Sequence, residues 1–384
     1  MKIGLLLPSV LMYDQWSKDK IFAPKQLFLD LANGLVARGH YVRVYSSSDT
    51  KTNAKLIPGD STLALEEPFA MKMRYADEEL RKILARRDAR MEYELDLTAK
   101  AFADAKMGIV DIIHSFLEFS AHYFDEVSQI PTVYTLHDTL PKKEYLDWWR
   151  FKRFPNHSYI AISKSQAQEL KTIINNIENV VYHGINLEEY EFSPNQGNYL
   201  FFMGRYMPEK GLDDAIKAAI QVNFPLIIAG SKEYEKIEFF KQVIAPLLSN
   251  SIVKQKEYLE PSSKINMIKN ARAFLFPIKW QEPFGMVMIE SMACGTPVIA
   301  YNRGSVSEIL RDGLTGFIID QDNEDRPGKG TWIIKKQGIE GLVEAIKRIG
   351  EIDRKACRKH VEENFTVEKM VKGYERVYTQ ILNK

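Results

Sequence analysis

Two glutamates flank a Phe-Gly pair in the stretch WQEPFGMVMIESMACGTPVIAY, residues 280–301. Glu282 precedes an apolar segment typical of a buried helix, and Glu290 lies inside that segment. Amides at a helix start bind anions, and a carboxylate on a buried helix needs hydrogen-bond donors, which sugar hydroxyls would provide. Two simpler interpretations stay open. Glu282 can be a helix-dipole anion worth under about 1 kcal/mol, and Glu290 a glutamate on the helix's polar edge.

The loop between the two glutamates also supplies backbone donors. Pro283 and Gly285 shape this loop. We expect the amides of Phe284, Gly285 and Met286 to point toward a ligand, because they lie at the positive end of the following helix.

A second set of candidate residues is found in GRYMPEKG, residues 204–211, after a predicted strand. Gly204 permits a tight turn, and Arg205 and Lys210 flank the start of the next helix. Two cations beside a helix start are a plausible diphosphate site, because the side chains, the amides and the helix dipole all favour negative charge. An ordinary solvated basic loop is the alternative, since Lys and Arg are mostly surface residues.

Two further residues are candidates because of their positions. His137 ends a strand in TVYTLHD, and ligands of parallel sheets bind beyond the carboxyl ends of strands. A loop histidine bonded to Asp138 or to backbone is the alternative. Tyr258, in KQKEYLEP, could contact a nucleobase or be an ordinary surface tyrosine.

The string EPFGMVMIESMACGTPVIAYNRGSVSEILRDGLTGF resembles the donor-site signature of glycosyltransferase family four, retaining enzymes of the GT-B architecture. The signature has two glutamates separated by seven residues, here Glu282 and Glu290. GRYMPEKGLDDAIKA and YHGINLEEY also resemble the family, and LVARGHYVRVYSS does so more loosely. The similarity is strong for residues 199–320 and weak before residue 110.

The resemblance implies a role for each candidate. Arg205 and Lys210 would neutralise the diphosphate of a nucleotide-sugar donor, and Glu290 would bind the ribose hydroxyls. The donor sugar would be held by Glu282 and the neighbouring amides of Phe284 and Gly285. His137 would approach the reacting sugar and the acceptor.

These roles predict a retaining glycosyltransferase of the hexosyltransferase type, acting from a nucleoside diphosphate sugar on an unidentified hydroxyl acceptor. Fixed cations would stabilise the leaving group, so we expect no metal ion and no cofactor. The alternatives are a nucleotide-sugar epimerase, a phosphorylase, or a non-catalytic nucleotide-sugar-binding protein on the same scaffold.

The sequence departs from the family pattern in two places. Many members carry Gly-Gly after the first strand, whereas this chain reads PSVLMYDQWSKDKIFAPKQ there. The usual Asn-Gly between the domains is His183-Gly184. The first change puts phosphate or acceptor contacts by that loop in doubt.

The elements that position these residues follow an alternating pattern. Short apolar runs alternate with amphipathic segments, which is typical of α/β proteins with parallel sheets. Strands are expected at 2–7, 41–45, 110–114, 132–136 and 159–162, then at 199–203, 226–229, 273–276, 297–300 and 316–319. Helices are expected at 23–38, 77–106, 211–222, 262–270 and 286–294. Ser305 with Glu308, and Ser163 with Gln166, have capping-box spacing.

The chain length favours two domains. We expect two Rossmann-like, doubly wound domains facing across a cleft, at residues 1–188 for the acceptor and 189–365 for the donor. The last helix, 366–384, is expected to pack back on the first domain.

The bulk composition excludes several classes of protein. The net charge is +1, which argues against a broad nucleic-acid-binding face. Two cysteines are too few for a disulfide framework and lack zinc-site spacing. The start MKIGLLLP is too short for a signal peptide, and no segment reaches membrane length. A cytoplasmic enzyme of unknown oligomeric state is expected.

One stretch bears on location within the cell. Residues 141–155, PKKEYLDWWRFKRFP, contain a mixture of basic and aromatic residues. Such a mixture is typical of segments that bind the surface of anionic membranes. An acceptor site or a tightly packed helix would also fit, so peripheral membrane contact is one of three interpretations.

Overall fold

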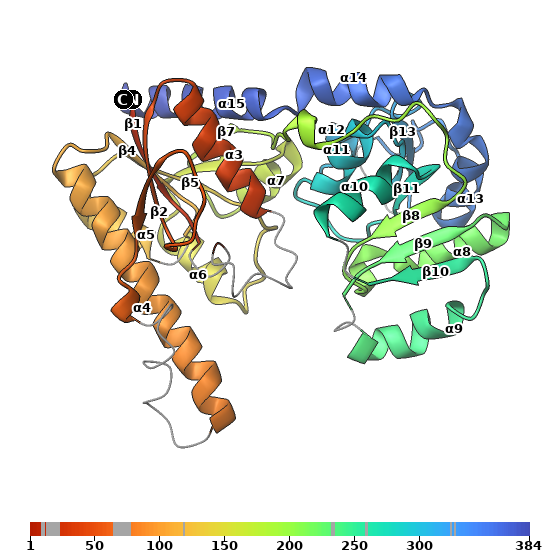
Figure 1. The fold of residues 1–384 in the computed structure, drawn as a ribbon, viewed down its shortest axis with the longest axis horizontal. Coiled ribbons are helices and arrows are strands. Elements are labelled where there is room, and N and C mark those ends of the chain that lie inside the picture. Colours follow the sequence, from red (N-terminus) through yellow and green to blue (C-terminus); the bar gives the residue numbers. More distant parts are fainter. Residues whose placement is uncertain are drawn as a thin grey trace. The chain divides into compact units, whose positions relative to one another are not determined.

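The structure is a computed structural model that describes residues 1–8, 12, 24–63, 78–117, 120–231, 235–257, 260–322, 325 and 328–384, with side chains omitted for 78–87. The chain forms two compact units (Figure 1). The first comprises Met1–Ile162, Ala167–Tyr182 and Val367–Lys384, and the second comprises Ser163–Gln166 and His183–Thr366.

The first unit contains a seven-stranded sheet in which every pairing is parallel, with the order β3-β2-β1-β4-β5-β6-β7. Its strands are β1 Lys2–Leu6, β2 Tyr41–Ser46, β3 Lys55–Pro58, β4 Ile112–Ser115, β5 Thr132–Thr135, β6 Ser158–Ala161 and β7 Ile177–Val180. Five of these were predicted. The edge strands β3 and β7 were not predicted, because neither contains a buried residue and neither forms an apolar run.

Helices cover this sheet (Figure 1). They are α3 Pro24–Ala37, α4 Glu78–Lys106, α5 Ala121–Ser128, α6 Leu146–Arg153, α7 Lys164–Leu170 and α15 Val367–Leu382. The last helix shares one hydrophobic core with α3 and the strands, through Val371, Tyr374 and Tyr378. A Cβ on Gly34 of α3 would lie 2.7 Å from Val371, so the absence of a side chain there lets α15 pack closely.

The second unit contains a six-stranded parallel sheet with the order β10-β9-β8-β11-β12-β13. Its strands are β8 Leu200–Met203, β9 Leu226–Ala229, β10 Val253–Lys256, β11 Ala273–Phe276, β12 Val298–Tyr301 and β13 Gly316–Ile319. The five predicted strands are confirmed. Edge strand β10 was missed because three of its four residues are exposed and polar.

The main helices of this unit are α8 Leu212–Val222, α10 Pro261–Lys269, α11 Met286–Ala293, α13 Gly338–Arg348 and α14 Arg354–Asn364. Shorter turns are α9 Ala245–Leu247 and α12 Val306–Ile309. The predicted helices 211–222, 262–270 and 286–294 agree with α8, α10 and α11 to within one residue.

The two capping-box predictions had different outcomes. The Gln166 N–H donates to the Ser163 hydroxyl at 3.0 Å, so the serine half of that motif is confirmed. The motif at Ser305 is wrong, because the Ser305 hydroxyl donates to the Phe284 carbonyl and forms no cap. Glu308 instead accepts the N–H groups of Lys164 and Ser165, in the same unit.

Strands β8 and β11 are neighbours in the second sheet, with Leu200 opposite Ala273 and Phe201 opposite Phe274. Both strands therefore end at the same edge of the sheet, and the loops that follow them meet there. The Lys279 N–H donates to the Glu209 carbonyl at 2.8 Å, which fixes the two loops together.

Candidate active site

The loops after β8 and β11 bring Lys210 and Glu282 together. Lys210 Nζ lies 3.3 Å from Glu282 Oε2, and the Trp280 indole N–H donates to the same oxygen at 2.9 Å. The Lys210 ammonium also lies over the Trp280 ring, 4.4 Å from its centroid. Both charged side chains are mostly shielded from water, which strengthens their interaction. A cation and a carboxylate thus sit side by side near the start of α11.

The backbone of Glu282 is held by the loop after β12. The Ser305 N–H donates to the Glu282 carbonyl at 2.9 Å, and the Gly304 N–H donates to Gln281 Oε1 at 2.7 Å. Gly304 has φ +59°, and a Cβ there would lie only 2.2 Å from the Glu282 carbonyl oxygen. Only glycine allows this approach, so Gly304 determines where Glu282 lies.

The segment that leads into α11 presents backbone amides. Phe284 is buried against the His183 ring, with centroids 4.7 Å apart, and Gly285 adopts φ +79° directly before Met286, the first residue of the helix. The first amides of a helix have no partner within it. The segment 284–286 can therefore offer N–H groups to an anion or a hydroxyl beside Glu282.

Glu290 lies on α11 and is buried, with 8% of its surface exposed. Lys264 Nζ donates to its Oε1 at 2.7 Å, and the Tyr190 hydroxyl donates to the same atom at 3.2 Å. The interpretation of Glu290 as a surface residue is wrong, because the helix is buried around it. Protein donors thus satisfy one carboxylate oxygen, and within the described part of the chain no partner is found for Oε2.

Arg205 and Gly204 follow β8. The Gly204 N–H donates to the Ala229 carbonyl, which continues the pairing of β8 with β9. Arg205 is exposed and forms no ion pair with any residue that the structure describes. Its guanidinium is therefore available to an anion, although it does not touch Lys210 or Glu282.

The start of α8 carries two acidic residues that were not among the predicted site residues. Lys279 Nζ lies 2.9 Å from Asp213 and 3.2 Å from Asp214. Burial raises the pKa of Asp214. Burial acts in the same direction on Asp213, but its hydrogen bond to Lys279 and the positive charges of Lys279 and Lys217 together lower its pKa. Lys279 and Trp280 directly precede Gln281 and Glu282 in the sequence. Their position next to a predicted site residue could have identified them as candidates.

His137 belongs to the first unit, at the end of β5. Its ring packs edge-on against Phe28, at 5.2 Å between centroids, and at a tilt against Phe116, at 5.5 Å. Burial lowers the pKa of His137 to about 3. The imidazole is therefore neutral near pH 7, so it can donate or accept a hydrogen bond but is a weak base.

Two expectations fall on parts of the chain outside the described residues. These are the contact of Tyr258 with a nucleobase and the loop after β1, where Met12 alone is described between Pro8 and Pro24. Both stay predictions.

An Asp-x-Asp pair follows β13, and the protein uses both of its carboxylates. Asp320 accepts bonds from the Gly330 amide and the Trp332 indole, while Asp322 pairs with Arg303 at 2.8 Å. In the described ranges no group of three or more His, Cys, Asp or Glu side chains is arranged to hold a metal ion. Nor is any helix in those ranges long and apolar enough to cross a membrane.

Comparison with solved structures defines the class of the fold. The chain is similar to sucrose-phosphate synthase from Thermosynechococcus elongatus, with a TM-score of 0.70 and 17% identity over 100% of this chain and 99% of that one. It is also similar to the Anabaena protein HepE in complex with UDP and glucose, with a TM-score of 0.69 and 17% identity over 99% and 100% of the two chains. The two parallel-sheet units thus form a GT-B fold, as predicted.

Sequence comparison then gives the family. The model of Glycosyltransferase Family 4 matches residues 26–189, and that of Glycosyl transferases group 1 matches residues 186–330. An uncharacterized glycosyltransferase of Methanocaldococcus jannaschii is 32% identical over 289 residues, which cover 71% of this chain and 76% of that protein. The chain belongs to glycosyltransferase family 4. It is a glycosyltransferase, as the resemblance implied.

Proposed function

We propose that this enzyme transfers a hexosyl group from a nucleoside diphosphate sugar to an acceptor hydroxyl, with retention of configuration and without a metal ion. The observation that carries the proposal is the contact between Lys210 and Glu282 beside the start of α11. A cation there suits a pyrophosphate, and a carboxylate with nearby amides suits the hydroxyls of the sugar.

Charge development explains how these residues would accelerate the reaction. When the bond between the anomeric carbon and the diphosphate breaks, the leaving oxygen keeps the electron pair. Lys210, the exposed Arg205 and the amides of 284–286 would stabilise that charge more in the transition state than in the ground state. The acceptor oxygen then bonds to the same face of the sugar, and its proton passes to the departing phosphate.

Glu290 would hold the ribose. Its Oε1 is bonded to Lys264 and Tyr190, so the ribose hydroxyls would donate to Oε2. A carboxylate already fixed by two protein donors loses little rotational freedom when it binds, which favours affinity.

The first unit would bind the acceptor, with His137 near the reacting centre. A neutral imidazole with a pKa of about 3 is too weak a base to take a proton from a hydroxyl near pH 7. We therefore assign His137 a positioning role, as a hydrogen-bond partner of a sugar hydroxyl.

Thermal-shift measurements with UDP-, GDP- and ADP-sugars test donor binding. A donor at a hundred times its dissociation constant stabilises the protein by about 2.7 kcal/mol. UDP-glucose is the first donor to test, because HepE was solved in complex with UDP and glucose. The acceptor is then sought among glycans, lipids and small alcohols with the donor that binds.

Product analysis tests the reaction itself. NMR of the product should show that the new glycosidic linkage has the same anomeric configuration as the donor. The turnover rate should be unchanged in the presence of EDTA. An inverted product, or activity lost with EDTA and restored by a divalent ion, would contradict the proposal. Incubation of the enzyme with donor alone, or with donor and phosphate, separates the alternatives. An epimer of the donor would indicate an epimerase, and a sugar phosphate would indicate a phosphorylase. Binding of the donor without transfer or hydrolysis would indicate a non-catalytic nucleotide-sugar-binding protein.

A further inference from the structure

Helix α6 and the residues just before it form a surface with concentrated positive charge. Within residues 141–155 five basic side chains stand against two acidic ones, which leaves a net charge of +3 in a chain whose total is +1. One acid, Asp147, is paired with Arg150 at 2.7 Å. The other four basic residues are exposed, namely Lys142, Lys143, Lys152 and Arg153.

The exposed face of α6 also carries large apolar side chains. Leu146 is 81% exposed, Tyr145 58% and Trp149 57%. Positions 145, 149 and 152 are four and three residues apart, so they lie along one side of the helix with Leu146 and Arg153 beside them. Leu146 and Trp149 expose apolar surface to water next to four cations.

The opposite side of α6 is part of the protein core. Trp148, Phe151 and Phe154 are buried. Phe154 stacks on the His122 ring at 5.4 Å with an interplanar angle of 9°, and on the His157 ring at 5.0 Å. Three of the five aromatic residues in the stretch therefore serve packing, which confirms the packed-helix interpretation for this side only.

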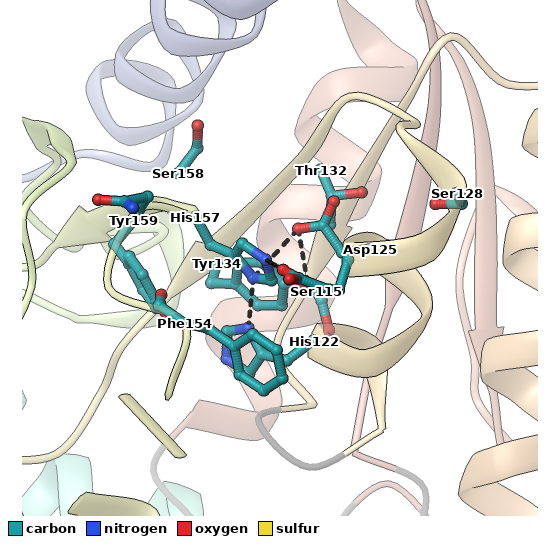
Figure 2. A network of polar contacts seen from close by, with 12 residues as sticks. Ser115, His122, Asp125, Ser128, Thr132, Tyr134, Phe154, His157, Ser158 and Tyr159 are labelled. Carbon is teal, nitrogen blue, oxygen red and sulfur yellow. Dashed lines mark hydrogen bonds and ion pairs between the residues drawn. The ribbon is translucent and has the colours of Figure 1, made fainter. Parts of the chain in front are cut away.

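A polar network holds the end of α6 in place (Figure 2). The Nδ1 atoms of His122 and His157 are 2.9 Å apart, and His157 Nδ1 lies 3.3 Å from Asp125. The Tyr134 hydroxyl donates to the same carboxylate at 3.0 Å. The network joins α5, β5 and the connection that follows α6, and Phe154, directly after α6, stacks on two of its rings. The exposed face of α6 is therefore presented on a packed support.

We propose that the outer face of α6, with Lys142 and Lys143, docks on the surface of an anionic lipid bilayer. The four exposed cations would attract the headgroups, while Leu146 and Trp149 would enter the boundary between headgroups and acyl chains. An indole with a polar N–H is well suited to that boundary. The net positive charge of the patch, which also contains the exposed Glu144, favours a negatively charged partner. Its exposed Leu and Trp side chains favour a lipid surface over a partner that offers charges alone.

The docking does not depend on which sugar or acceptor the enzyme uses. Residues 136–145 connect the carboxyl end of β5, where His137 lies, to α6, so both belong to the unit that would dock. This arrangement would give the first unit access to an acceptor in the membrane.

Vesicle co-sedimentation tests the docking with the full-length protein. Vesicles of phosphatidylcholine with about one third phosphatidylglycerol should bind it, pure phosphatidylcholine should not, and binding should weaken steeply as salt rises above about 0.1 M. The variant Lys152→Gln/Arg153→Gln should bind about twenty-five-fold more weakly, since each basic side chain near such a surface contributes about a fivefold factor. Leu146→Ser/Trp149→Ser should weaken binding about tenfold.

A matched control uses Lys106→Gln/Met107→Ser, two exposed residues at the end of α4. It should bind as the wild type does. All variants change exposed side chains, so their thermal unfolding should match that of the wild type. Absence of binding to anionic vesicles, equal binding to neutral ones, or undiminished binding by both α6 variants would each overturn the proposal.

Discussion

Lys210 Nζ and Glu282 Oε2 are 3.3 Å apart, although 72 positions separate them in the sequence, and the Trp280 indole N–H bonds the same oxygen. The pair is formed by two loops at one edge of a sheet, and it joins the two opposite charges that the proposed reaction needs. Because the side chains touch, neither is expected to act independently of the other.

Substitution of either residue should strongly reduce sugar transfer. Glu282→Gln and Lys210→Ala are each expected to lower turnover by about a hundredfold or more, the usual scale when a preorganised electrostatic partner is lost. The double variant should lose much less than the product of the two factors, since residues in contact are not additive. Steady-state kinetics of the three variants provide the measurement. Near-normal transfer by both single variants would remove the assignment, and strictly multiplicative losses would show that the contact is not important.

Gly304→Ala should displace Glu282. A Cβ at this position would lie 2.2 Å from the Glu282 carbonyl oxygen and 2.4 Å from its nitrogen, in addition to the strain at φ +59°. Gly39→Ala is the matched control, because Gly39 has φ +83° but no atom within 4 Å of the added Cβ. The control should lose about 1–2 kcal/mol of unfolding free energy and keep its activity. Gly304→Ala should be less stable still and at least tenfold less active. Similar kinetics for both variants would contradict the proposed support of Glu282.

Lys264→Met should destabilise the protein. It removes the ammonium that donates to the buried Glu290 carboxylate at 2.7 Å. Among the described residues, the Tyr190 hydroxyl then remains as a donor to that carboxylate. We expect a loss of about 1–3 kcal/mol in urea unfolding and weaker donor binding in calorimetry. Lys269→Met, on the same helix, breaks an ion pair with Glu191, which is 75% exposed. That control should change stability by less than about 1 kcal/mol. An equal effect of the two substitutions would refute the role of Lys264.

Acid should destabilise the first unit below pH 6.5. Burial lowers the pKa values of His114, His122 and His137 from 6.5, that of His137 to about 3. Each is neutral when folded but takes up a proton when unfolded, so its stabilising effect is complete above pH 6.5 and is lost as the pH falls. Burial raises the pKa of Asp125 to about 6, which acts in the opposite direction.

Burial also raises the pKa of Glu169 in this unit. Because three histidines act against these two carboxyls, we expect net proton uptake on unfolding, so the free energy of unfolding should fall, with a positive slope against pH, between pH 6 and 5. Urea titrations across pH 5–7 measure this slope. Replacement of His122 with Phe should reduce the slope, because one group that takes up a proton on unfolding is removed. A slope unchanged in that variant, or stability that rises toward pH 5, would contradict the expectation.

Local sequence patterns predicted most of the elements of the fold. Strands β1, β8 and β11 are apolar runs bounded by turn residues, and such runs are buried in parallel sheets whatever their partners are. The edge strands β3, β7 and β10 lack such runs, so only their pairing in the sheet identifies them. Similarly, Ser305 has the local spacing of a cap, but the Phe284 carbonyl lies closer in the folded chain and takes its hydroxyl.

The sequence by itself determined which residues are candidates for the donor site, because the spacing of Glu282 and Glu290 and the position of Lys210 before a helix are local properties. Their roles stay predictions. Only the tertiary structure decided that Lys210 contacts Glu282, that Lys264 and Tyr190 hold Glu290, and that His137 is neutral. The physical reason is that both the partner of a charged side chain and the burial that shifts a pKa depend on which loops come together at the edge of a sheet. That meeting is set by strand order and packing between residues far apart in the chain.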